Sequence, residues 1–234
     1  MKDQYVGDVN DFFKYAFLRS VQDHLAAPLV VCWLATANDG GPDGRRRRYL
    51  SQPEKYRSID SSLFDSMQRL VATAEPRIAD VERAAILPRA MFFRRILGDS
   101  LAERDGFFDE LWQRVPTDAT IFFDPDNGLE IKSTLKGRKG SSKYLYMDEL
   151  EIAGRGGHSV VVYQHFGRVE RTAYTDDQLQ RMKAALPEHD LFALTGTHIA
   201  FLVAATKASS DPLRAAAAAL RGQWSDLQAV DHLD

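Results

Sequence analysis

Acidic and basic side chains gather in a short segment directly after a run that reads as a buried strand. Thr120–Phe123 is β-branched and aromatic, which predicts a strand, and turn-forming residues follow it at once. Carboxylates with a lysine side chain close by can orient the amine of a substrate, bind a hard cation or exchange protons. An acidic turn that caps the next helix has the same composition and is the alternative. The candidate catalytic residues of this segment are Asp124, Pro125, Asp126, Asn127, Glu130 and Lys132.

A second element that could position this chemistry is the apolar run from Pro28 to Thr36. Its continuous hydrophobicity predicts a central strand buried on both faces. The glycine-rich loop Ala37–Gly44 follows at the carboxyl end of that strand, where ligands of open α/β sheets bind. The loop lacks the GxGxxG spacing of a dinucleotide site, but its glycines let the backbone approach a ligand closely.

The N-terminal segment adds further polar residues. Apolar residues at helical spacing predict a helix from Asp11 to about His24, with an Asn or Asp cap ahead of it. Lys14 lies one turn after Asp11, which predicts a local ion pair on one face of the helix.

Basic residues occur in two loops that could contact phosphates. Arg45–Arg48 is a run of four arginines, of which Arg46 and Arg47 are candidate substrate-binding residues, and Lys136–Lys143 reads as a mobile basic loop. A strand predicted at His158–Tyr163 ends in Gln164 and His165, which would lie at the same edge of the sheet as the acidic segment. The alternative for the two basic loops is that their side chains are ordinary solvated surface charges.

Composition and element order indicate a single α/β domain over residues 1–234. The chain is 44% hydrophobic with a net charge of −3 and one cysteine, Cys32, which we expect to be a small core residue. No apolar run approaches about 18 residues, so we expect no membrane span, and we expect a cytoplasmic protein. The sequence leaves the oligomeric state open.

The middle and the end of the chain predict further elements. Residues 51–118 read as mostly helical, with helices at 61–74 and 105–115 and apolar runs at 84–87 and 90–93 that could be strands. The later elements expected are a helix over 143–152, a helix over 175–186 capped by Thr175, a hairpin over 191–206 and a helix over 211–220. We therefore expect a three-layer sheet, mostly parallel, with a C-terminal antiparallel hairpin.

Two motifs resemble those of the bacterial 23S ribosomal RNA adenine-N6 methyltransferases. The segment Val6–Tyr15 is similar to the family's opening HAGNxADxxKH motif, which it matches at Gly7, Asp11 and Lys14, with Tyr15 in place of the last histidine. The segment from Asp124 to Ser133 resembles the D-P-P-Y-E-x-K-T motif, with Asp126 and Asn127 replacing the proline and the aromatic residue and two residues inserted. The resemblance covers the N-terminal helix and residues 119–206.

This resemblance implies a Rossmann-like methyltransferase-type sheet and S-adenosylmethionine as cofactor. In that family the aspartate and the proline carbonyl accept hydrogen bonds from the target amine, and these roles carry over to Asp124 and Pro125. The implied substrate is an amine of a nucleic acid or nucleotide, with Asp11, Tyr15, Arg46, Arg47, Gln164 and His165 as substrate-binding candidates. The cofactor-loop candidates are Asn38, Asp39, Gly40 and Gly41.

Two other functions remain open. Asp124, Asp126 and Glu130 could hold Mg²⁺ in a metal-dependent nuclease or phosphodiesterase, with Lys132 supporting the attacking water, although the PD-(D/E)xK spacing is not met. The chain could also be a non-catalytic Rossmann-like protein that binds nucleic acid. Glu130 and Lys132 could pair with each other or with Lys14.

Overall fold

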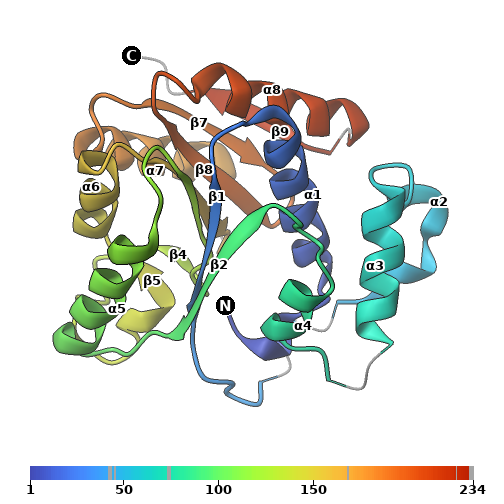
Figure 1. Ribbon diagram of the computed structural model, residues 1–234, viewed down its shortest axis with the longest axis horizontal. Helices are drawn as coiled ribbons and strands as arrows, with labels where there is room; N and C mark the ends of the chain where they lie inside the picture. Colours follow the sequence, from blue (N-terminus) through green and yellow to red (C-terminus); the bar gives the residue numbers. More distant parts are fainter. Residues whose placement is uncertain (42–43, 45, 73–74, 168, 225, 232–234) are drawn as a thin grey trace.

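A seven-stranded mixed β-sheet forms the middle of the molecule and carries helices on both faces (Figure 1). The computed structural model describes residues 1–41, 44, 46–72, 75–167, 169–224 and 226–231. The strands of this sheet are β1 (Leu29–Ala35), β2 (Ala90–Ile96), β3 (Thr120–Phe123), β6 (Ser159–His165), β7 (Asp190–Thr195), β8 (Ile199–Ala205) and β9 (Gln228–Asp231). Two short strands, β4 (Gly128–Leu129) and β5 (Tyr144–Leu145), pair separately.

The sheet has the strand order β2-β1-β3-β6-β8-β7-β9. The pairs β2–β1, β1–β3 and β3–β6 are parallel, whereas β8 runs antiparallel to both β6 and β7. The expected α/β class and the antiparallel C-terminal hairpin are confirmed. Strand β9, which pairs antiparallel with β7 at the edge, has no counterpart in the expectation from sequence.

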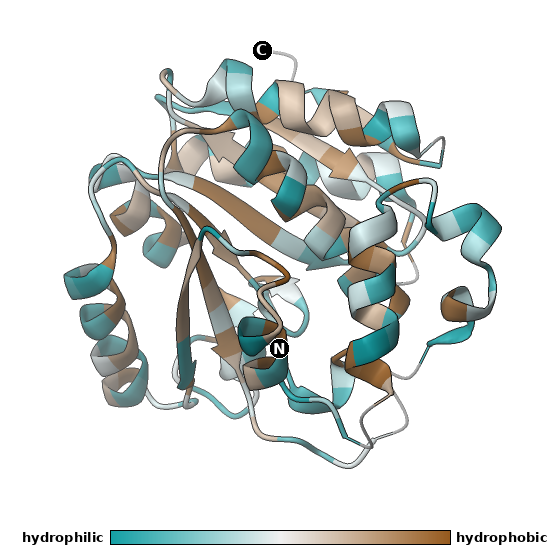
Figure 2. Ribbon diagram, turned by 45° about the vertical axis from the view of Figure 1, so that its right-hand side comes forward, coloured by the Kyte–Doolittle hydropathy of each residue, from teal (hydrophilic) through white to brown (hydrophobic). Residues whose placement is uncertain are grey.

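Helices cover the two faces of the sheet over two separate hydrophobic cores. The helices are α1 (Val9–His24), α2 (Pro53–Tyr56), α3 (Ser61–Val71), α4 (Ile78–Arg83), α5 (Leu101–Arg114), α6 (Met147–Arg155), α7 (Arg171–Ala185) and α8 (Ser210–Gln223). One core joins the sheet to α1, α3 and α8, and the other joins it to α5, α6 and α7, so the fold has three layers. Figure 2 shows that the strands of the sheet are mostly hydrophobic, whereas the helices around them carry both hydrophobic and hydrophilic residues.

Every side chain of β1 is buried, because the strand lies between β2 and β3 and both of its faces are covered. Val31 and Trp33 face the core with α1, whereas Val30 and Cys32 face the core with α5. This alternation confirms a strand covered on both sides, and it makes Cys32 a core residue as expected.

Two helices begin earlier than the sequence predicted. Helix α1 begins at Val9, because the Asp8 side chain accepts the N–H of Asn10 and caps it, so Asp11 lies inside the first turn. Helix α7 begins at Arg171, because Glu170 accepts the N–H groups of Thr172 and Ala173. Thr175, the predicted cap, is therefore a buried interior residue of that helix.

The segment 51–118 contains the edge strand of the sheet. Residues 90–93 belong to β2, as one of the two apolar runs predicted, but the run 84–87 is a turn and not a strand. Ala85 there has φ 48°, and Ile86 and Leu87 are buried in the core with α1. Helix α3 packs on α1, which places most of this segment on one face of the sheet.

Hydrogen bonds from outside the loop tie the basic loop 136–143 to the rest of the protein, which its glycine- and serine-rich sequence did not indicate. The Asp99 carboxylate accepts the N–H groups of Gly140 and Ser142 at 2.8 Å each. Arg104 donates to the carbonyl oxygen of Ser141 at 3.0 Å. The following helix begins and ends later than the predicted range 143–152, because Tyr144–Leu145 pairs with β4 and α6 spans Met147–Arg155.

No helix within the described part of the chain is both long enough and apolar enough to cross a lipid bilayer.

Candidate functional site

Lys14 joins two aspartates that are far apart in the sequence. Its Nζ atom donates to Asp11 Oδ1 at 2.9 Å, one turn back on α1, and to Asp124 Oδ2 at 2.7 Å, directly after β3. All three side chains are at most 4% exposed. The predicted Asp11–Lys14 pair is thus confirmed, and the expected pairing of Lys14 with Glu130 or Lys132 is replaced by Asp124.

The charges of this triad set its proton equilibria. Burial raises the pKa of Asp11 to about 6, although the charge of Lys14 opposes the rise. Burial alone would lower the pKa of Lys14, but Asp11 and Asp124 outweigh it and raise that pKa. Lys14 therefore stays protonated at neutral pH and fixes Asp124, whereas Asp11 can exchange a proton close to neutral pH.

Aromatic rings surround the Lys14 ammonium group. Its nitrogen lies 4.8 Å from the ring centroid of Tyr163 and 5.9 Å from those of Trp33 and Tyr15. Cation–π contacts of this kind add to the ion pairs that hold the charge. Tyr15 packs edge-on against Trp33 in the core, which makes it a supporting residue and not a group facing a substrate.

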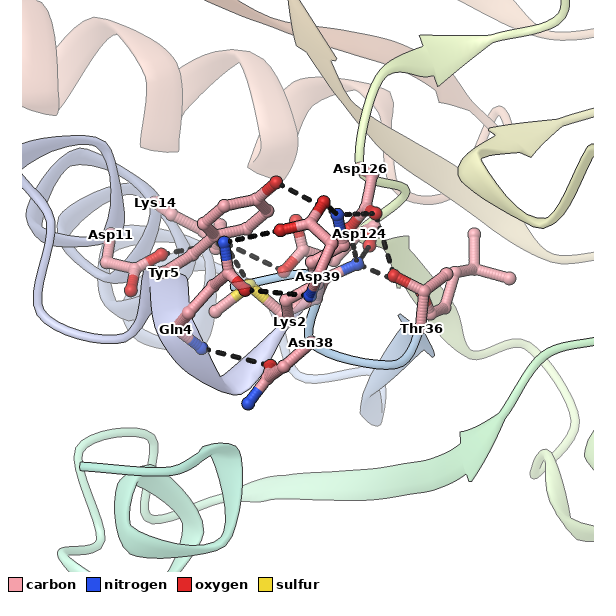
Figure 3. Close-up of polar contacts among 12 residues, drawn as sticks. Lys2, Gln4, Tyr5, Asp11, Lys14, Thr36, Asn38, Asp39, Asp124 and Asp126 are labelled. Carbon is pink, nitrogen blue, oxygen red and sulfur yellow. Dashed lines mark hydrogen bonds and ion pairs between the residues drawn. The ribbon is translucent and has the colours of Figure 1, made fainter. Parts of the chain in front are cut away.

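Asp126 forms a second charged cluster next to the triad (Figure 3). Its carboxylate lies 2.7 Å from the Met1 ammonium nitrogen and 3.5 Å from Lys2 Nζ, and it accepts the Thr36 hydroxyl at 2.7 Å. Burial would raise the pKa of Asp126, but the neighbouring ammonium groups outweigh it and lower that pKa. The carboxylate is therefore charged across the neutral pH range.

Carbonyl oxygens complete the acceptors around the Met1 ammonium group. It donates to the backbone oxygens of Leu34 at 2.9 Å and Asp124 at 3.0 Å, at the ends of β1 and β3. The ends of these two neighbouring parallel strands thus form a set of oxygen atoms that binds an ammonium group.

A cavity of about 430 Å³ opens beside both clusters at the carboxyl edge of the sheet. Asp11, Lys14, Asp124 and Asp126 contribute to its wall, together with Arg46 and His165. Partial desolvation of the ring and the nearby charge of Arg46 lower the pKa of His165, so this imidazole is neutral at pH 7. The remaining lining residues are Met1, Tyr5, Asp8, Asn10, Gly44, Pro125, Asn127 and Tyr163.

The predicted cofactor loop lines a different hollow, of about 490 Å³. Asn38, Gly40, Gly41 and Arg47 contribute to it, and Asp39 faces the N-terminal residues instead. Arg47 donates to the Val6 carbonyl oxygen at 3.0 Å.

Gln164 supports the wall of the cavity beside the triad from behind and is not one of the residues that line it. Its amide nitrogen donates to the carbonyl oxygen of Asn127 at 3.0 Å and to the hydroxyl of Tyr174 at 3.1 Å, and its oxygen accepts the N–H of Leu129 at 2.9 Å. Gly128 has φ 114°, and a Cβ atom there would lie 2.2 Å from the Gln164 side chain. A glycine is thus required at position 128 for the close contact with Gln164, which in turn fixes the backbone of Asn127.

Two of the predicted catalytic residues lie away from the triad. Glu130 pairs with Arg181 at 3.2 Å, and Lys132 is exposed. In the described ranges no group of three His, Cys, Asp or Glu side chains is arranged to hold a metal ion. The geometry therefore does not favour the metal-dependent alternative built on Asp124, Asp126 and Glu130. Arg45, part of the predicted arginine run, lies outside the described residues.

Sequence reasoning missed Lys2 and Thr36 as members of the site, because no local pattern marks either residue. Asp8 and Asn10 carried a signal, since the segment ahead of α1 is more polar than helix packing requires.

Comparison with models of protein families gives no match, and comparison with curated proteins gives none either.

Proposed function

We propose that this protein is an S-adenosylmethionine-dependent methyltransferase-like protein that acts on an amine of a nucleic acid or nucleotide. The observation that carries the proposal is Asp124, fixed by Lys14 at the end of β3, beside oxygen atoms that already hold an ammonium group. Carboxylate and carbonyl oxygens in this arrangement are the acceptors that an amine substrate requires.

The arrangement of the sheet supports this proposal. Strand β8 runs in reverse between β6 and β7, which agrees with the Rossmann-like methyltransferase type that the sequence resemblance implies. The chain leaves β1 toward β2 on one side and returns to β3 on the other, so the ends of β1 and β3 form a topological switch point. Ligands of open α/β sheets bind at such points.

The oxygen acceptors at the switch point fit the amino-acid end of S-adenosylmethionine. Leu34 O, Asp124 O and Asp126 bind the α-ammonium group of Met1, which has the same chemistry as the α-ammonium group of the cofactor. When bound, the cofactor would supply an electrophilic methyl group.

The residues of the triad have distinct roles in this proposal. Asp124, held in one orientation by Lys14, accepts a hydrogen bond from the substrate amine and directs its lone pair. Asp11 lines the same cavity, and its pKa of about 6 suits it to take up the proton that an amine loses on substitution. Arg46 and His165 at the cavity wall contact the remainder of the substrate.

Calorimetric titration with S-adenosylmethionine and S-adenosylhomocysteine tests the proposal. We expect both to bind the unmodified protein and the surface variant Asp23→Asn, and to bind Asp126→Ala, which lacks the carboxylate proposed for the cofactor's ammonium group, at least tenfold more weakly. The absence of binding to the unmodified protein at millimolar ligand would contradict the proposal. Binding without methyl transfer to adenine-containing oligonucleotides would instead favour the non-catalytic alternative.

A further inference from the structure

Residues Met1–Tyr5, which we call the N-terminal strap, separate the two hollows of the site. Met1 and Tyr5 line the cavity that contains Asp124, and Asp3 and Gln4 line the hollow that contains Gly40 and Gly41. The strap therefore forms a partition between the predicted catalytic residues and the predicted cofactor loop.

Lys2 is the centre of the strap's contacts (Figure 3). Its Nζ atom lies 2.5 Å from Asp39 Oδ2 and 3.5 Å from Asp126 Oδ2, and it donates to the Tyr5 hydroxyl at 3.3 Å. Burial would lower the pKa of Lys2, but its acidic partners raise it, and the hydrogen bond from Lys2 lowers the pKa of Asp39. Lys2 is only 3% exposed, so one ammonium group occupies the slot between these two carboxylates.

Polar contacts also hold the rest of the strap. Gln4 exchanges hydrogen bonds with Asp39, donating through Nε2 at 2.9 Å and accepting the Asp39 N–H at 3.1 Å. Asp3 accepts the N–H of Ile78 at 2.9 Å, and the Met1 carbonyl oxygen accepts the N–H of Thr36 at 2.9 Å. A ligand or water can replace these hydrogen bonds, whereas Met1, whose side chain is buried in the core with α1, is also held by apolar packing that has no such substitute.

We propose that the strap is an internal occupant of the ligand site, and that a ligand with a primary ammonium group displaces Lys2 from Asp39 and Asp126. Release of Lys2–Tyr5 joins the two hollows and frees Asp39 and Asp126 Oδ2 from Lys2, while Met1 keeps its contact with Asp126 Oδ1. The inference goes beyond methyl transfer, because it requires only that the slot recognises an ammonium group.

Removal of the Lys2 charge tests the strap without any cofactor. Lys2→Met keeps most of the side-chain volume, and Lys139→Met is the matched control on an exposed lysine. In hydrogen–deuterium exchange, we expect the amides of Thr36, Asp39 and Ile78 to exchange at least tenfold faster in Lys2→Met and at the original rate in the control. Unchanged exchange at all three amides would overturn the proposal.

A titration with 1,4-diaminobutane tests the slot itself. An internal competitor lowers the apparent affinity of a ligand for the same site, so we expect diaminobutane to bind Lys2→Met at least tenfold more tightly than the unmodified protein. Equal affinity would contradict the proposal. Asp39→Asn, which alters a half-exposed partner, serves as a second variant if Lys2→Met does not fold: it should also speed exchange at Thr36, and failure to do so counts against the strap. None of these readouts involves S-adenosylmethionine, so their failure is distinct from failure of the proposed function.

Discussion

Two buried ion-pair networks in this protein are alike in burial and differ in use. Arg104 and Glu149, on α5 and α6, form a bidentate pair with bonds of 2.9 and 2.8 Å. Arg104 also donates to the carbonyl oxygens of Ser141 and Tyr144. The partners of this pair are thus other buried groups of the protein. The Lys14 triad has two carboxylates for one cation and lines a cavity.

The difference separates a structural network from a candidate site. Arg104 fixes the loop 136–143 on α6, and neither Arg104 nor Glu149 lines any of the cavities described above. Asp11, in contrast, has a pKa near neutral pH beside a cavity, which is typical of functional carboxylates. Burial of charge alone therefore does not distinguish the two networks, whereas an excess of charge facing a cavity marks the Lys14 triad as the candidate site.

Removal of Arg104 should have the largest effect on stability. Arg104→Met removes the bidentate partner of Glu149, although Lys136 remains 3.1 Å away, and it removes the Arg104 donor from the carbonyl oxygens of Ser141 and Tyr144. We therefore expect a loss of about 3–5 kcal/mol in the free energy of unfolding. Urea denaturation measures this loss. A loss below about 1 kcal/mol would show that the network is not the closed structural element described here.

Protonation of Asp11 should make stability depend on pH. Because the folded pKa of about 6 is above the ordinary value of 3.8, the folded protein binds this proton more tightly than the unfolded chain. The stabilisation of the folded protein by this proton is complete below pH 3.8 and is lost as the pH rises to 6. The free energy of unfolding therefore falls by about 3 kcal/mol in total. Asp11→Asn should remove this fall from urea denaturation curves measured between pH 4 and 7, and Asp23→Asn should retain it.

Replacement of Lys14 should cost less stability than replacement of Arg104, despite equal burial. In Lys14→Met, Asp11 can take up a proton and the cavity admits water, so we expect a loss of about 1–3 kcal/mol, accompanied by loss of ligand binding. Equal destabilisation by the two substitutions in urea would remove the distinction between the networks.

The Thr36 hydroxyl should make the smallest contribution. Thr36→Val removes one hydrogen bond to Asp126, which keeps its ammonium partners, so we expect a loss of about 0.5–1.5 kcal/mol. The exposed Thr117→Val serves as the control for the loss of a hydroxyl group. A loss of stability as large as that of Lys14→Met would contradict this account, because Thr36 would then matter as much for folding as Lys14 does.

Local patterns predicted most of the elements and one half of the site. The apolar run at β1 and the hairpin β7–β8 could be read from residue type alone, and so could the Asp11–Lys14 pair at helical spacing. The contact of Lys14 with Asp124 spans 110 positions and depends on how α1 packs over the ends of the strands. No local rule predicts it, and the same holds for Lys2 between Asp39 and Asp126.

Capping and pairing explain the remaining errors. Glu170 ahead of α7 and Asp8 ahead of α1 each accept backbone N–H groups. Both helices therefore begin a few residues earlier than the sequence predicted. The basic loop was expected to be mobile from its glycines and serines, but Asp99 and Arg104, remote in sequence, supply its hydrogen bonds.

A matched pair of variants tests the central claim most directly. Asp124→Asn and Glu149→Gln each remove one charge from a buried network with little change in shape. In titrations of the folded proteins with an adenine-containing oligonucleotide in the presence of S-adenosylhomocysteine, we predict at least tenfold weaker binding of the oligonucleotide for Asp124→Asn and binding within twofold of the unmodified protein for Glu149→Gln. Equal affinities for the two variants would contradict the assignment of the Lys14 triad as the ligand site.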